Sequence, residues 1–183
     1  MRQAFVLLSL MIVAGSALGQ VKEERRYGVR FNPELYPQGT PVETLGSLLR
    51  AVDKERFDYI AAFLLDPAFI NDQLQITKAL FDGKATEQVE GEGLAKKGFD
   101  PTFIRNRKRD LAAQMNFENL TRRLKTKLTN DPNALKEINK IYRDGEFKEG
   151  GEATTARHPD IKGKLLSFKL VNGRWYIENK MVE

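Results

Sequence analysis

Residues 166–178 have the sequence LSFKLVNGRWYIE, which is typical of an antiparallel β-hairpin. Apolar and polar residues alternate on both sides of Asn172-Gly173, and this dipeptide favours a two-residue type I′ turn. Such a turn pairs Phe168 with Ile177 and Leu170 with Trp175, which places the four apolar side chains on one face of the hairpin. A shift of one residue would mix the two faces, so the turn and the alternation predict the same register.

Four pairs of residues upstream predict helix starts: Thr40-Pro41, Asp66-Pro67, Asp100-Pro101 and Asp131-Pro132. In each pair, a side-chain oxygen can cap the helix, and the proline occupies the first turn, where its missing N–H costs nothing. Between the first two starts, the apolar stripe rotates by about 110° at 100° per residue. We therefore predict two short helices there, with a break at residues 53–56.

The middle of the chain is predicted from weaker signals. A third helix is expected to end near Asp82, with Phe69, Ile76, Ala79 and Leu80 facing inward, and the glycine-rich residues 84–98 are expected to form a loop. The apolar stripe of residues 101–129 changes side by roughly 160° at 100° per residue. Either the helix breaks near Asn116 or one helix is buried on opposite sides along its length, and we favour the break.

Helices followed by a terminal hairpin indicate the α+β class, with N-terminal helices packed on a C-terminal antiparallel sheet. Residues 152–157 are expected to supply a third strand. We predict a single domain over residues 40–183. Residues 20–39 are predicted to be an extended arm without regular structure, part of which packs on the domain through its aromatic and apolar side chains.

The first nineteen residues have the layout of a secretory signal peptide. Arg2 provides a positive charge, residues 5–13 are almost continuously apolar, and Ala17 and Gly19 put small residues before a cut at Gln20. A retained membrane anchor is the alternative, but a spanning helix needs about 20 apolar residues. We therefore expect a secreted or periplasmic protein with no transmembrane segment after cleavage between Gly19 and Gln20.

The composition limits the kinds of partner and of covalent modification that we expect. The chain has 30 basic and 25 acidic residues, and loss of residues 1–19 lowers the net charge from +5 to +4. Outside the cytoplasm, this mild positive charge is a poor argument for nucleic acid. The chain contains no cysteine, so it has no disulfides and no lipidated cysteine, and its stability depends on its hydrophobic core.

Two parts of the sequence resemble the nuclear-transport-factor-2-like superfamily, also called SnoaL-like or cystatin-like cone proteins. The first is residues 40–67, where a capped helix is followed by Glu55-Arg56-Phe57-Asp58-Tyr59. The second is residues 152–177, which end in Gly173-Arg174-Trp175-Tyr176-Ile177. The resemblance implies a cone formed by helices and a sheet. It implies no single activity, because the superfamily includes isomerases, dehydratases and binding modules.

The sequence contains no catalytic set above background, so we predict no catalytic residue, metal site or cofactor. His158 is the only histidine and precedes a proline in an expected loop, where no partner for acid–base catalysis is evident. Asp53, Glu55 and Asp58 are explained better by capping and surface charge than by a metal site. The resemblance implies another possibility, an apolar pocket with a wall made by Tyr59, Phe63, Phe168 and Trp175. The simpler interpretation places these four residues in the core.

Basic residues are densest in residues 105–127. The candidate polyanion contacts are Arg105, Lys108, Arg109, Arg122 and Arg123. Acidic residues interrupt them, and they are spread around the helix, so a solvated face is the simpler interpretation. Single-stranded nucleic acid is disfavoured because no stacking aromatics are interleaved with them.

Three functions remain open. We favour an exported, non-enzymatic domain that binds a small molecule or an envelope protein of unknown identity. The first alternative is a small-molecule lyase or isomerase with an acid–base residue in the cone. The second is an envelope-associated protein that binds anionic polymers through its basic helices.

Overall fold

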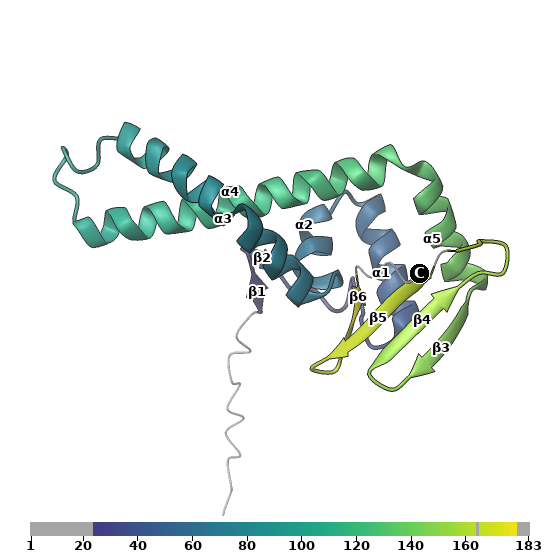
Figure 1. Cartoon of the computed structure of the whole chain (residues 1–183). Helices are drawn as coiled ribbons and strands as arrows, with labels where there is room; N and C mark the ends of the chain where they lie inside the picture. The colour runs from purple at the N-terminus through teal and green to yellow at the C-terminus, as the bar shows by residue number, and fades with distance from the viewer. Residues whose placement is uncertain (1–23, 164, 179–183) are drawn as a thin grey trace, which may run out of the picture.

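The computed structural model describes residues 24–163 and 165–178. In this part of the chain, helices precede a four-stranded antiparallel sheet, which confirms the α+β class (Figure 1). The helices are α1 (Pro41–Asp53), α2 (Phe57–Tyr59), the π-helix η1 (Ile60–Leu64), α3 (Pro67–Gly91), α4 (Pro101–Asn130) and α5 (Pro132–Asp144). The strands are β1 (Arg25–Arg26), β2 (Val29–Arg30), β3 (Glu146–Gly150), β4 (Ala153–Arg157), β5 (Leu166–Val171) and β6 (Arg174–Glu178). The predicted signal peptide lies outside the described residues.

All four predicted cap–proline pairs begin a helix. In each case the side-chain oxygen of the capping residue accepts a hydrogen bond from a backbone N–H in the first turn. The acceptors are Thr40, Asp66, Asp100 and Asp131, before α1, α3, α4 and α5 respectively. These bonds satisfy donors that have no partner inside the helix, so local chemistry defines the start of each helix.

The predicted break after the first helix is confirmed. Helix α1 ends at Asp53, and α2 begins at Phe57 and continues directly into η1, whose five residues are all buried. The wider π turn is closed by a hydrogen bond from Leu65 N to Ile60 O (3.0 Å). The next residue, Asp66, donates its N–H to Ile177 O (2.9 Å), so the end of η1 is joined to β6.

The predicted hairpin register is confirmed, because β5 and β6 pair Phe168 with Ile177 and Leu170 with Trp175. The expected third strand is β4, which pairs with β5. A further strand, β3, was not predicted and forms the other edge of the sheet, in the order β3-β4-β5-β6. The inner face contributes Phe168 to the main core, and α1 packs against β6 and α5.

The loop predicted over residues 84–98 was wrong for residues 84–91, which are helical, and is confirmed for residues 92–98. Helix α3 continues to Gly91, and a short connection leads to α4. Of the residues predicted to face inward, Phe69 packs against the main core. The prediction was wrong for the other three, since Ile76 and Leu80 are 75% and 56% exposed and Ala79 is exposed. The side that faces the protein carries Ile70, Leu74, Thr77, Phe81, Ala85 and Val89. This stripe is hard to recognise in the sequence, because Thr77 is polar and Ala85 is small.

The favoured break near Asn116 was also wrong, because α4 is continuous and is buried on opposite sides along its length. Its first half contacts α3 through a small cluster containing Leu111 and Ala112, and its second half contacts the main core through Phe117. Asn116 is buried at the change of side. Its amide donates to Leu74 O (2.8 Å) and accepts from the Thr77 hydroxyl (2.7 Å).

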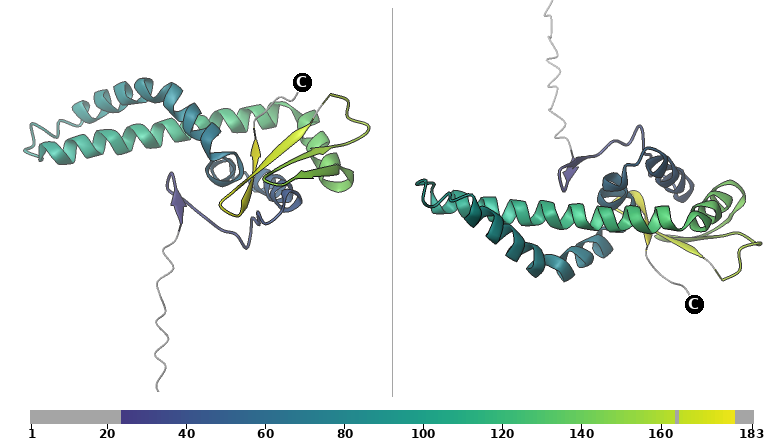
Figure 2. Two further views of the ribbon diagram at one scale, coloured as in Figure 1. Left: turned by 60° about the horizontal axis from the view of Figure 1, so that its bottom comes forward. Right: turned by 90° about the horizontal axis from the view of Figure 1, so that it is seen from above.

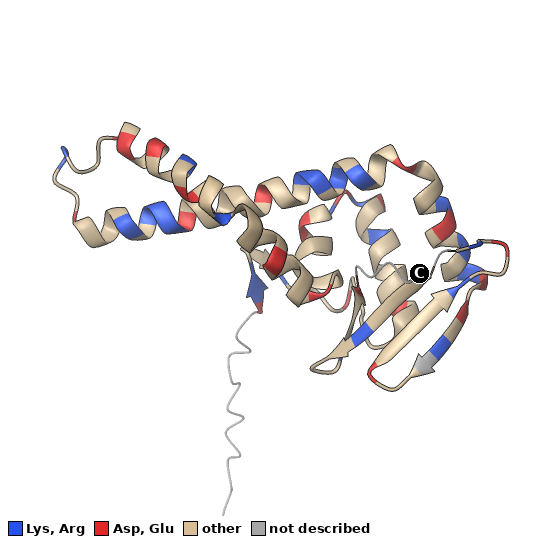
Figure 3. Cartoon of the chain, viewed as in Figure 1, with Lys and Arg blue, Asp and Glu red and all other residues tan. Residues whose placement is uncertain are grey.

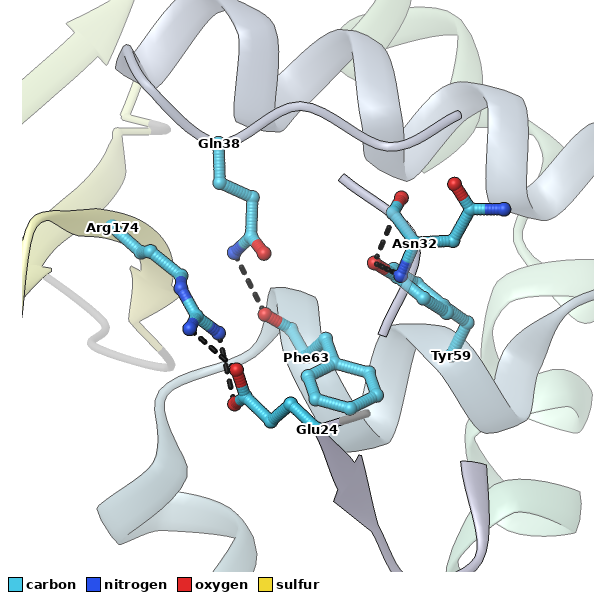
Figure 4. Close-up of polar contacts among 6 residues, drawn as sticks. All are labelled: Glu24, Asn32, Gln38, Tyr59, Phe63 and Arg174. Atoms are coloured by element: carbon cyan, nitrogen blue, oxygen red, sulfur yellow. Dashed lines mark hydrogen bonds and ion pairs between the residues drawn. The ribbon is translucent and has the colours of Figure 1, made fainter. Parts of the chain in front are cut away.

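The arm before α1 contains more structure than predicted. Strands β1 and β2 form a short hairpin in which Tyr27 and Gly28 have positive φ. The Tyr27 ring stacks on Phe117 of α4 with centroids 4.6 Å apart. The carboxylate of Glu24 pairs with both terminal nitrogens of Arg174, so the arm is fastened to β6 as well (Figure 4). Hydrogen bonding to Arg174 holds the pKa of Glu24 below its usual value.

Gln38, at the end of the arm, joins three parts of the fold. Its side-chain amide donates to Phe63 O in η1 (2.7 Å; Figure 4) and to Trp175 O in β6 (2.8 Å). Its backbone oxygen accepts from Trp175 N (3.0 Å). The residue is buried, so these bonds form where water cannot replace them.

Tyr59 links the arm to the core. Its ring contacts Tyr36 with centroids 4.2 Å apart, and its hydroxyl donates to Asn32 O (3.3 Å) and accepts from Asn32 N (3.2 Å; Figure 4). Burial raises the pKa of Tyr59 from 10.0 to about 12. The folded protein therefore retains this proton at pH values where the unfolded chain releases it.

We predict a loss of stability between pH 10 and pH 12 that depends on Tyr59. Below pH 10 both states are protonated and stability is at its full value; above it, only the unfolded state gains from ionisation. The free energy of unfolding should fall by about 1.4 kcal/mol per pH unit, or about 2–3 kcal/mol across the interval. Denaturant titrations should show a flatter profile for Tyr59→Phe and an unchanged profile for the exposed control Tyr142→Phe. Equal profiles for all three proteins would contradict the prediction.

Candidate functional site

An open cavity of about 570 Å³ lies between the helices and the inner face of the sheet. Helices α1, α3, α4 and α5, the π-helix and strands β5 and β6 all contribute to it. The wall is mainly aliphatic and contains Leu45, Leu48, Ile60, Leu65, Phe69, Ile70, Leu120, Leu124, Leu128, Ile138, Leu166 and Ile177. Its volume is within the range of about 300–1,000 Å³ that is usual for small-molecule sites.

The second half of α4 forms one side of the cavity. Leu120, Leu124 and Leu128 follow one another at intervals of one helical turn, and each is only half-buried. They pack against the main core on one side and line the cavity on the other. A contiguous apolar surface that the fold leaves partly uncovered indicates a place where something binds.

Positive charges flank this leucine stripe. Arg122, Arg123 and Lys127 line the cavity from exposed positions on α4, and none of them forms an ion pair with another described residue. Glu178 is the one acidic side chain among the described lining residues. The rim therefore carries an excess of positive charge above an aliphatic interior.

The four predicted pocket-wall residues are in the main core and do not line this cavity. Tyr59, Phe63 and Phe168 are fully buried, and Trp175 is half-buried against the same core. Tyr59 and Phe63 contact each other with ring centroids 5.0 Å apart. Their sequence neighbours contribute instead, because Ile60 and Ile177 both face the cavity.

The five predicted polyanion contacts fall into two separate places on α4 (Figure 3). Arg122 and Arg123 are at the cavity. Arg105, Lys108 and Arg109 are on the first half of the helix, where Lys108 pairs with Glu90 (2.9 Å) and Arg109 pairs with Asp110. Lys127 was missed, although its position four residues after Arg123 on the edge of a leucine stripe was visible in the sequence.

Three of the other titratable residues considered from the sequence, His158, Asp58 and Glu55, have structural partners. His158 Nδ1 accepts the backbone N–H of Asp160 (3.1 Å), as in a turn. Asp58 pairs with Arg56 (2.9 Å) and Glu55 with Lys125 (2.7 Å). Hydrogen bonding to Lys125 lowers the pKa of Glu55. Among residues 24–163 and 165–178, no three His, Cys, Asp or Glu side chains are grouped so that they could hold a metal ion.

Comparison with known proteins gives no relative on which to build an assignment. The chain matches no protein-family model, no curated protein and no solved structure at a significant level. In the part of the chain that the structure describes, no helix has the length and apolar character needed to cross a membrane.

Proposed function

We propose that this protein is an exported, non-enzymatic binding domain whose ligand is an amphiphilic anion, of the class of long-chain fatty carboxylates. The observation that carries the proposal is the aliphatic cavity with unpaired cations at its rim. An alkyl chain would occupy the interior, and its carboxylate would lie beside Arg123 and Lys127.

Both parts of such a ligand gain from this arrangement. Each methylene group removed from water contributes about 0.8 kcal/mol, so the alkyl chain supplies most of the affinity. The charged rim contributes orientation more than affinity, because exposed ion pairs are worth only about 0–1 kcal/mol each. Three cations against one carboxylate favour an anionic head group over a neutral or cationic one.

Two features of the sequence support the proposal. The N-terminal nineteen residues have the layout of a signal peptide, which supports export. The resemblance of residues 40–67 and 152–177 to nuclear-transport-factor-2-like proteins supports a cone whose open mouth holds a small molecule. The position of the cavity between helices and sheet agrees with that proposal.

The character of the lining favours binding over the two alternatives. A lyase or isomerase needs an acid–base group in contact with the substrate, whereas the interior of this cavity is aliphatic and its charged side chains are at the rim. A polyanion-binding face needs a continuous row of cations, whereas the basic residues of α4 are divided between two places.

We predict that dodecanoate binds in the cavity and displaces 1-anilinonaphthalene-8-sulfonate, a fluorescent anion with an aromatic body. The double variant Arg123→Glu/Lys127→Glu reverses the charge beside the leucine stripe and should weaken dodecanoate binding about tenfold, a change of about 1.4 kcal/mol. The matched control Arg105→Glu/Arg109→Glu makes the same change in net charge on the same helix, away from the cavity. It should alter affinity less than twofold.

Equal losses in the two double variants would mean that net charge, and not the cavity rim, attracts the ligand. Unchanged binding in Leu124→Glu, which puts a carboxylate into the aliphatic wall, would place the ligand elsewhere. Chemical conversion of the added ligand on incubation with the protein would favour the lyase or isomerase alternative.

A further inference from the structure

Helices α3 and α4 form a hairpin that projects well beyond the rest of the protein (Figure 2). The outer part of the hairpin has a small core of its own, made by Ala85 and Val89 of α3 with Leu111 and Ala112 of α4. This packing fixes the tip, residues 92–105, at a distance from the cavity. The tip takes no part in the proposed ligand site.

The tip carries two large aromatic side chains in solvent. Phe99 and Phe103 are 46% and 49% exposed, and their rings stack with centroids 5.3 Å apart. Asp100 holds them in place, because its carboxylate accepts the N–H groups of Thr102 (2.8 Å) and Phe103 (3.1 Å) at the start of α4. The fold thus presents an ordered apolar surface that it does not itself cover.

Positive charge surrounds the two rings. Lys96, Lys97 and Arg105 are all exposed, and none forms an ion pair with another described residue. Between residues 93 and 109 the chain has six basic residues and one acidic residue, Asp100, whose carboxylate is already engaged in capping. The acidic residues that border this segment are already paired with its own basic residues: Glu92 with Arg107, Glu90 with Lys108 and Asp110 with Arg109.

We infer that the tip docks on the surface of an anionic lipid bilayer. Phe99 and Phe103 would enter the interfacial region, where aromatic side chains are favoured, and the three cations would contact lipid phosphates. Each cation close to an anionic leaflet makes the free energy of binding more favourable, and so does the burial of the two rings. A protein partner is a poorer fit, because a stable interface needs about 800 Å² on each side and the tip is narrow.

The absence of cysteine from the chain allows a site-specific test. A single cysteine introduced by Ala95→Cys, at an exposed position in the tip, would carry a polarity-sensitive fluorophore. Vesicles containing phosphatidylglycerol should shift its emission to shorter wavelength, whereas vesicles of phosphatidylcholine alone should not. The same fluorophore at Ala153→Cys, an exposed position on β4, should show no shift with either vesicle.

Paired variants separate the tip from general hydrophobicity. Phe99→Ser/Phe103→Ser should lower partitioning to the anionic vesicles by about tenfold or more, because apolar burial drives interfacial binding. The matched control Ile76→Ser/Leu80→Ser removes two exposed apolar side chains from the same hairpin, about three turns or more before the end of α3. It should change partitioning less than twofold. All variants have the same N-terminal residues, so any binding of that apolar segment to lipid is equal in all of them. A difference in partitioning between the variants therefore reports the tip.

Three outcomes would overturn the inference. One is the absence of an emission shift at the tip with phosphatidylglycerol vesicles. Another is an equal loss of partitioning in the two serine pairs. The third is an equal shift with dissolved dextran sulfate, which would show that the tip binds anionic polymers and does not enter lipid. Dodecanoate displacement assays on the same variants should be unaffected, so failure here is distinguishable from failure of the proposed ligand site.

Discussion

Replacing Phe168 by alanine is expected to lower the free energy of unfolding by about 3–5 kcal/mol, the usual cost of truncating a fully buried phenylalanine. Phe168 is 0% exposed and lies opposite Thr154 on β4 and Ile177 on β6. Its ring also approaches Phe147 of β3, with centroids 6.1 Å apart. Because Phe168 lies in the middle of the inner face, its truncation leaves a cavity that no single neighbouring side chain can fill.

A second variant of the hairpin provides the comparison. Trp175 is only half-buried, so Trp175→Ala should cost less than Phe168→Ala, about 2 kcal/mol for the apolar area that it exposes. Urea titrations of both variants measure the difference. Equal losses, or a larger loss for Trp175→Ala, would show that the centre of the core is at the other end of the hairpin.

The elements with local chemical signals were predictable. The four helix starts follow from a capping oxygen beside a proline, and the hairpin register follows from Asn172-Gly173 together with alternation. Each of these signals lies within a few residues of the structure that it determines. The α+β class and the break between α1 and α2 follow from such signals, without information about distant contacts.

The length of α3 and the continuity of α4 depend on contacts between the two helices. Residues beyond Asp82 remain helical because Ala85 and Val89 pack on the first half of α4, and an isolated helix would not gain this stabilisation. An asparagine can cap a helix, which fits the break that we expected near Asn116. The buried side chain instead bridges the helices through Leu74 and Thr77. A polar residue that pairs across a helix interface cannot be distinguished from a cap by sequence pattern alone.

The candidate site also combines features that are visible in the local sequence with features that depend on distant contacts. The leucine stripe and its flanking cations are visible in residues 120–128, but the cavity depends on how far the stripe is covered by α1, α3 and α5. Two of the aromatic residues chosen from the resemblance to cone proteins are covered by the arm, because Tyr36 contacts Tyr59 and Phe31 contacts Phe63. Phe168 lies beside Phe147 within the sheet. The aromatic residues of the arm indicated that part of it packs on the domain, but a segment with little regular pattern does not show which core residues it covers.

Gln38 provides the second large effect, because this single buried amide joins the arm, η1 and β6. Both of its side-chain partners, Phe63 O and Trp175 O, are acceptors, so the nitrogen must face them. Gln38→Ala removes both donors and should lower the free energy of unfolding by about 2–3 kcal/mol. The loss is limited at one partner, since the Thr44 hydroxyl also donates to Trp175 O (3.3 Å).

Gln38→Glu tests the same bonds without changing the shape of the side chain. At neutral pH the introduced carboxylate has no proton to donate and faces two carbonyl oxygens, so the variant should be less stable than Gln38→Ala. The protonated carboxyl can donate to only one of the two oxygens, so part of the loss remains at every pH. The pKa of the introduced carboxyl is raised in the folded protein, so the additional penalty of ionisation is absent below the ordinary glutamate value of about 4.3 and grows by about 1.4 kcal/mol per unit above it. In urea titrations, the loss of stability of Gln38→Glu relative to wild type should therefore be larger at pH 7 than at pH 4. The exposed control Gln88→Glu should have the stability of wild type at both pH values. If Gln38→Glu matched wild type at pH 7, the amide would not be the donor that joins the arm to the sheet.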